Sequence, residues 1–120
     1  MQDFRNLKVW EKAHALTLEV YEKTKDFPGE ERYGLTSQIR RCAVSVPTNI
    51  AEGCGRGSDA DMARFLQIAR GSASELEYTL LLARELGMIK APAHEALAPR
   101  IEEIQRMLAA LIRKLTAQSS

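Results

Sequence analysis

Apolar residues recur about every 3.6 residues along almost the whole 120-residue chain, and no stretch alternates apolar and polar residues for the length of a strand. This periodicity places an apolar stripe on each of several helices. Turn-forming residues interrupt it at Phe27-Pro28-Gly29, within 53–58 and at Gly87. The pattern therefore predicts four helices, over about 7–25, 30–52, 59–86 and 93–116.

The four stripes predict one shared core, to which the first helix contributes Val9 to Val20, the second Leu35 to Ile50, and the third Met62 to Ala83 with Phe65 included. The fourth helix shows the spacing most clearly, with Leu97, Ile101, Ile104, Leu108, Leu111 and Leu115. Amphipathic helices on short connections pack as a single all-α domain over 1–120, an antiparallel up-and-down four-helix bundle. The second helix has two open starts, Glu30 and Leu35, and Pro47 predicts a kink in it. Pro47 should free the carbonyl of Ala43, and we expect the side chain of Ser45, Thr48 or Asn49 either to bind the freed groups or to bind across an interface.

The composition limits the compartment and the partners. The net charge is +1, so the chain as a whole has no strong attraction to nucleic acid or anionic lipid. The N-terminal residues lack a signal-peptide core, and no apolar run approaches ~18 residues, which predicts a cytoplasmic protein with no membrane partner. Cys42 and Cys54, the two cysteines, should therefore stay reduced.

Catalytic and metal-binding patterns are incomplete in this sequence. Glu11 and His14 match one Glu-x-x-His unit of a di-iron bundle, but His94 has no glutamate three residues before it. Cys42 and Cys54 lack a CxxC pattern or a neighbouring histidine. We expect no enzyme activity, no catalytic residue, no metal site and no cofactor.

Two explanations remain for the glycine-rich segment 53–58. Its glycines suit a helix end joined to a Ser58 cap on the next helix. Loop amides beside Arg56 could instead hold one phosphate. The segment lacks the lysine of a phosphate-binding P-loop, and it follows a helix rather than a strand.

Arginines cluster in the middle of the chain. Residues 32–57 contain four arginines and one acidic residue, a local charge of +3. Because guanidinium groups bind phosphate through paired donors, this segment predicts nucleic-acid contact, repeated around an oligomer. Ion pairs with nearby acidic residues are the open alternative. The candidate nucleic-acid contacts are Arg40, Arg41, Arg56 and Arg64.

A second apolar stripe on the first helix has no place in a single bundle core. The third helix also carries apolar residues outside its core-facing stripe. Because exposed apolar patches usually mark interfaces, we expect a homo-oligomer. The candidate interface residues are Leu7, Trp10, His14, Leu18, Tyr21 and Leu82.

Several motifs in this order resemble a known family. They include Leu7-Lys8-Val9-Trp10, Tyr33-Gly34-Leu35-Thr36, Gln38-Ile39-Arg40-Arg41 and Ser45-Val46-Pro47-x-Asn49-Ile50-Ala51-Glu52-Gly53. The chain resembles the bacterial four-helix bundle proteins of the 23S rRNA intervening-sequence type, and the accessory protein of diversity-generating retroelements is similar. The resemblance implies a ring of subunits, a pentamer, without known catalytic activity. It also implies RNA or DNA contact through Arg40, Arg41 and Arg56, and a reverse transcriptase as a partner. The alternative is an oligomeric scaffold that binds only proteins.

Overall fold

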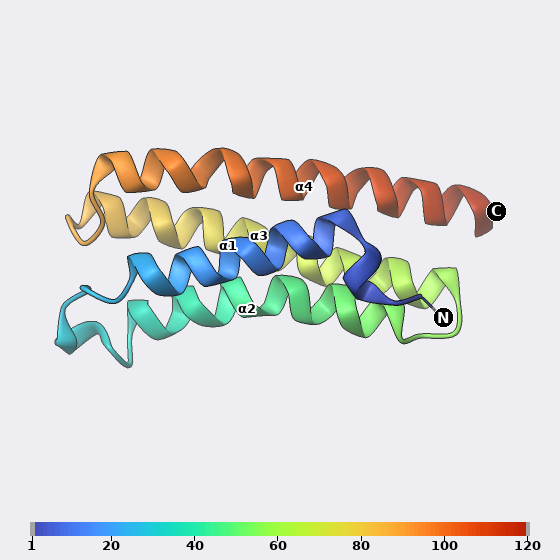
Figure 1. Ribbon diagram of the computed structural model, residues 1–120, viewed down its shortest axis with the longest axis horizontal. Coiled ribbons are helices and arrows are strands. Elements are labelled where there is room, and N and C mark those ends of the chain that lie inside the picture. Colours follow the sequence, from blue (N-terminus) through green and yellow to red (C-terminus); the bar gives the residue numbers. More distant parts are fainter. Residues whose placement is uncertain (1, 120) are drawn as a thin grey trace.

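The computed structural model describes residues 2–119, with side chains up to residue 117. Figure 1 shows four long helices lying side by side in a rod of 47 × 23 × 20 Å. They are α1 (Lys8–Lys23), α2 (Leu35–Cys54), α3 (Asp59–Glu85) and α4 (Ala91–Ser119). Two short 3-10 helices, η1 (Phe4–Asn6) and η2 (Gly29–Glu31), precede α1 and α2. No strand occurs within residues 2–119, so the predicted all-α class is confirmed.

Contacts between helices define an antiparallel bundle. Each helix packs on the two beside it, in the cyclic order α1, α2, α3, α4, while within residues 2–119 the backbones of the diagonal pairs lie farther apart. Thr17 of α1 reaches Ala43 of α2, whereas Arg40, earlier in α2, reaches Thr24 near the end of α1. This opposite order also holds for the other pairs, as predicted. The α1–α4 pair is packed least extensively.

The core contains the predicted stripes with two changes. Phe65 is half-buried at the surface of α3 rather than in the core. On α4 the half-buried Leu111 faces α1, and Ile112 is buried in its place. An α-helix turns every 3.6 residues, so a strict 3.5-residue spacing drifts off the core after several turns.

Local capping sets the helix starts. α2 begins at Leu35, the later of its two predicted starts, and the Glu31 Oε1 atom accepts a hydrogen bond from the Leu35 N–H at 3.2 Å. α4 begins two residues earlier than predicted, because Pro92 fits a first helical turn. The Ser58 hydroxyl caps α3 by accepting a hydrogen bond from the Asp61 N–H at 3.1 Å.

Pro47 lies inside α2, and helix continues on both sides of it. These helix bounds do not define the direction of the axis on either side of Pro47, so the predicted kink stays a prediction. The carbonyl of Ala43 lacks its usual partner, because proline has no N–H. That partner is replaced by Thr17 of α1, whose buried hydroxyl lies 3.1 Å from the Ala43 oxygen and 2.8 Å from the Ala13 oxygen. The expected local partners bind elsewhere: Thr48 bonds the Val44 carbonyl, and Asn49 bonds Ser45.

Candidate functional site

An aromatic cluster covers the outer side of α1 next to α2. The Phe4 ring meets Trp10 edge to face at 4.8 Å, and the His14 ring stacks on Trp10 at 4.9 Å. These rings border an open groove of about 390 Å³ whose α2 side includes Val44 and Pro47. We call this surface, extended by the exposed Leu18 and Tyr21, the α1 aromatic face.

The predicted interface residues divide between several surfaces. Leu18 is 60% exposed and Tyr21 is 42% exposed, so both expose apolar area to solvent. Trp10, Leu7 and Leu82 are half-buried against the core. Leu82 belongs to α3, which lies diagonal to α1, and Leu7 lines a groove towards α4.

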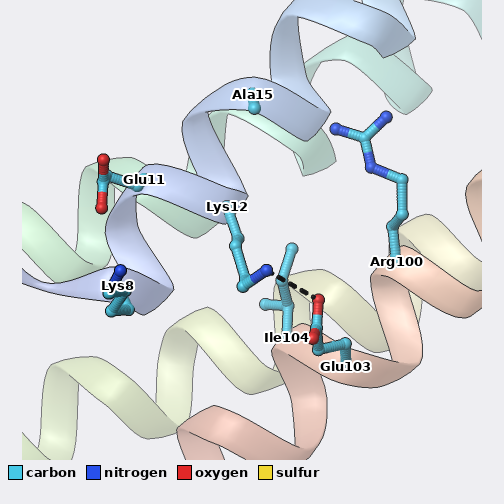
Figure 2. A pocket seen from close by; sticks show the side chains of 7 residues that line it. All are labelled: Lys8, Glu11, Lys12, Ala15, Arg100, Glu103 and Ile104. Atoms are coloured by element: carbon cyan, nitrogen blue, oxygen red, sulfur yellow. Dashed lines mark ion pairs between the residues drawn. The ribbon is translucent and has the colours of Figure 1, made fainter.

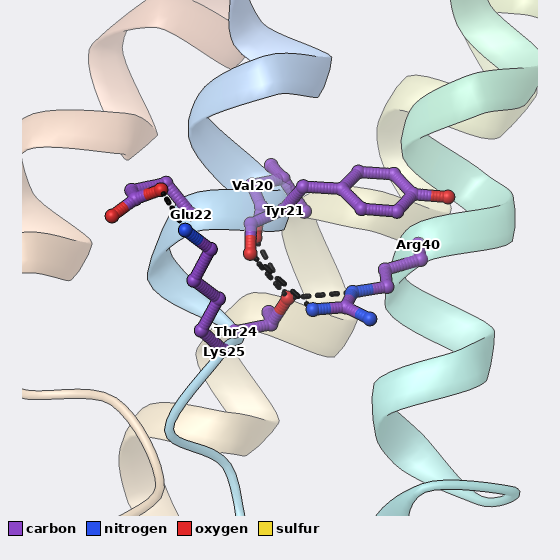
Figure 3. A network of polar contacts seen from close by, with 6 residues as sticks. All are labelled: Val20, Tyr21, Glu22, Thr24, Lys25 and Arg40. Atoms are coloured by element: carbon purple, nitrogen blue, oxygen red, sulfur yellow. Dashed lines mark hydrogen bonds and ion pairs between the residues drawn. The ribbon is translucent and has the colours of Figure 1, made fainter.

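Arg40 is engaged inside the chain, as Figure 3 shows. Its Nε donates to the Thr24 hydroxyl at 2.8 Å, and its Nη2 donates to the Tyr21 carbonyl at 3.3 Å. The guanidinium also lies 4.7 Å above the Tyr21 ring. Arg40 therefore holds the last turn of α1 against α2, and part of its donor capacity is unavailable to a phosphate.

Arg56 and Arg64 both contact one phenyl ring at the opposite end of α2. Their guanidinium carbons lie 4.6 and 4.8 Å from the centre of the Phe65 ring. Arg56 pairs with Glu52 at 3.5 Å, and Arg64 pairs with Asp61 at 3.8 Å. Both arginines therefore form the ion pairs with nearby acidic residues that were the alternative to nucleic-acid contact.

Arg41 remains the most available of the four candidates. Its side chain is exposed and forms no ion pair or hydrogen bond within the described part of the chain. About 20 Å of helix separates Arg41 from the end of α2 at Cys54, at 1.5 Å per residue. The four predicted arginines thus do not form one patch on a single subunit.

Helix packing explains the first glycine of the glycine-rich segment, Gly53. A Cβ atom on Gly53 would lie 3.2 Å from both the Met62 carbonyl oxygen and the Phe65 Cβ, because α2 and α3 approach closely here. The hollow beside it measures about 190 Å³, and both Arg56 and Asp59 line it. Close packing therefore accounts for Gly53, and the Ser58 hydroxyl caps the helix that follows.

Both thiols lie in surroundings that disfavour the thiolate. Burial, reinforced by the carboxylate of Glu75, raises the pKa of Cys42 to about 12. Burial, with a contribution from Asp3, also raises the pKa of Cys54. Neither cysteine therefore has the environment of a nucleophile. Within the described residues no three His, Cys, Asp or Glu side chains gather as metal ligands.

A polar contact line joins α2 to α3. The hydroxyls of Ser45 and Ser72 lie 2.7 Å apart, and the Asn49 amide donates to Ser45 Oγ at 2.9 Å. Further along, Gln38 donates to Glu75 at 3.4 Å. Much of the motif from Ser45 to Gly53 is therefore used inside the bundle.

Sequence reasoning missed a basic groove between α1 and α4. Figure 2 shows one end of it, where Lys12 and Glu103 form an ion pair of 3.2 Å across the two helices and Arg100 lies beside them. The other basic residues on the groove are Lys8 and Lys114. The spacing of Lys8 and Lys12 places them on one face of α1, but only the packing of α4 brings the rest alongside.

The comparisons place the chain among known proteins. The sequence profile of the 23S rRNA-intervening sequence protein family matches residues 5–110. The fold is similar to a crystal structure of a protein of unknown function from the S23 ribosomal protein family of Bacteroides thetaiotaomicron VPI-5482. The two share 28% identity with a TM-score of 0.80, over 87% of this chain and 97% of that chain. No curated protein matches the chain. None of the described helices could span a membrane.

Proposed function

This chain belongs to the 23S rRNA-intervening sequence protein family, and from that premise we propose that it acts without catalysis, as a homo-oligomer whose assembled surface binds RNA or DNA. The assembly is a cytoplasmic ring, with a pentamer as the expected size. The observation that carries this proposal is the α1 aromatic face, which the bundle leaves uncovered at Leu18 and Tyr21. Burying such a face against a second copy removes apolar area from water, the main driving force of association.

Leu18→Asp is expected to dissociate the oligomer into folded subunits. The side chain is 60% exposed, so a charge there affects the subunit contact without entering the core. Light scattering after gel filtration gives the mass, and circular dichroism checks that the bundle stays helical. Tyr33→Asp is the matched control, because Tyr33 is 87% exposed and lies between η2 and α2, outside the predicted interface residues. An oligomer that survives Leu18→Asp, or that both variants dissociate, would contradict the proposed interface.

Arg41→Glu is expected to weaken RNA binding by about tenfold or more, because the oligomer repeats the lost phosphate contact in every subunit. Binding of a labelled structured RNA is measured by fluorescence anisotropy at two salt concentrations, and it should weaken as salt rises. Arg106→Glu on α4 is the matched charge reversal, since Arg106 is also exposed. The absence of RNA binding at low salt, or equal losses in both variants, would count against nucleic-acid contact at Arg41.

The second candidate function is an oligomeric scaffold that binds only proteins. The pairing of Arg56 with Glu52 and of Arg64 with Asp61 favours it, because these arginines are already partly neutralised. An assembled protein that binds no RNA at either salt concentration would support the scaffold.

A further inference from the structure

The groove between α1 and α4 is long and open. Two adjoining hollows of about 480 and 350 Å³ follow the line between these helices, and both include Lys8. The first extends along α4 from Arg100 to Ile104, and the second from Met107 to Lys114. At 1.5 Å per residue, this part of α4 spans roughly 21 Å, the length of about four helical turns. We call the two hollows together the α1–α4 groove.

The chemistry of the groove is amphipathic. Its accessible apolar lining consists of Leu7, Ala15, Met107, Ala110 and Leu111, above the buried Val9 and Ile104. Four basic side chains and two carboxylates complete the lining, a formal excess of two positive charges: Lys8, Lys12, Arg100 and Lys114, with Glu11 and Glu103. The one ion pair among these groups is Lys12–Glu103, which leaves Lys8, Arg100 and Lys114 without a carboxylate partner in the described residues.

We propose that the α1–α4 groove docks an acidic amphipathic α-helix of a partner protein. The apolar face of that helix would cover the strip from Leu7 to Leu111, and its flanking carboxylates would meet Lys8, Arg100 and Lys114. Helices recognised in this way present apolar anchors at positions i, i+3, i+4 and i+7. The groove lies on the α4 side of α1, away from the aromatic face next to α2, so this inference goes beyond the proposed assembly and RNA binding.

Two other occupants fit the groove less well. A nucleic-acid backbone would meet the lysines but would leave the apolar strip against charged phosphates and water. One acidic surface of a second copy lies between α3 and α4, where Glu77 and Glu102 border a hollow of about 400 Å³. That surface is itself concave, and two concave surfaces leave a gap, whereas a single helix projects into the groove.

A helix-stabilised peptide of about 16 residues, with a leucine stripe flanked by glutamates, tests the proposal on the full chain. Two control peptides separate charge from apolarity: one replaces glutamate with lysine, and one scrambles the acidic sequence to abolish the stripe. The readout is the ¹³C-methyl spectrum of the protein's four methionines. We expect the acidic peptide to shift the Met107 signal while the signals of Met62 and Met88, which are not among the residues lining the groove, stay in place.

Charge reversal in the groove supplies the second measurement. Lys8→Glu combined with Lys114→Glu is expected to weaken peptide binding at least about tenfold. The matched control combines Lys90→Glu with Arg106→Glu, the same change in charge at two exposed positions outside the groove, and should leave binding unchanged. The proposal is overturned if the acidic peptide does not bind, if the scrambled peptide binds equally, or if RNA displaces the peptide and shifts Met107 itself. These outcomes leave the Leu18→Asp and Arg41→Glu tests unaffected.

Discussion

Gly53→Val is expected to lower the free energy of unfolding by about 3 kcal/mol, since overpacking at a close contact forces helices apart. A Cβ at this position would already lie 3.2 Å from a backbone oxygen of α3, which cannot rotate away. Valine adds two further methyl groups to the same space. The measurement is urea unfolding followed by circular dichroism.

Gly71→Ala is the matched control for that substitution. Gly71 also lies inside a helix, but a Cβ there would meet nothing within 4 Å. Alanine should therefore raise stability by up to about 1 kcal/mol through helix propensity alone. If Gly53→Val is as well tolerated as Gly71→Ala, the close approach of α2 and α3 is not what requires glycine at position 53.

Thr17→Val is expected to cost about 1–2 kcal/mol of stability, the cost of leaving a buried carbonyl without a donor. The Thr17 hydroxyl supplies the hydrogen bond that Pro47 cannot give to Ala43. In a Pro47→Ala background the cost should almost vanish, because the backbone N–H that alanine restores at this position can reach the same carbonyl. Urea unfolding of the four proteins in this double-mutant cycle measures the coupling.

Thr79→Val provides the comparison within the same protein. Thr79 is buried like Thr17, but its hydroxyl bonds carbonyls of its own helix, those of Glu75 and Leu76. Neither carbonyl faces a proline, so this substitution should cost less than Thr17→Val. An equal cost of Thr17→Val with and without Pro47 would show that the proposed hydrogen bond does not stabilise the fold.

The fold could be predicted because the apolar period is a local property of each helix. The stripes from Val9 to Val20 and from Leu35 to Ile50 are buried as expected, and they define which faces meet. The sequence pattern wrongly placed Leu111 in the core. Its fixed 3.5-residue spacing departs from the 3.6-residue turn of an α-helix, and the difference accumulates along a long helix.

The surfaces were harder to predict because they depend on what lies alongside a side chain. Arg40 and Arg41 are adjacent in sequence, yet one is bound to Thr24 and the other is exposed. The α1–α4 groove joins residues about one hundred positions apart, and no local pattern links Lys8 to Lys114. Such a site can be identified only from the packing of α1 against α4.

The contacts of Arg40 affect how genetic experiments on this protein are interpreted. A substitution there removes a clamp on the final turn of α1 along with a positive charge. A loss of nucleic-acid affinity in such a variant would have two causes, the loosened end of α1 and the missing arginine contact. A substitution at position 41 separates the two effects, because the Arg41 side chain makes no comparable contact within the described residues.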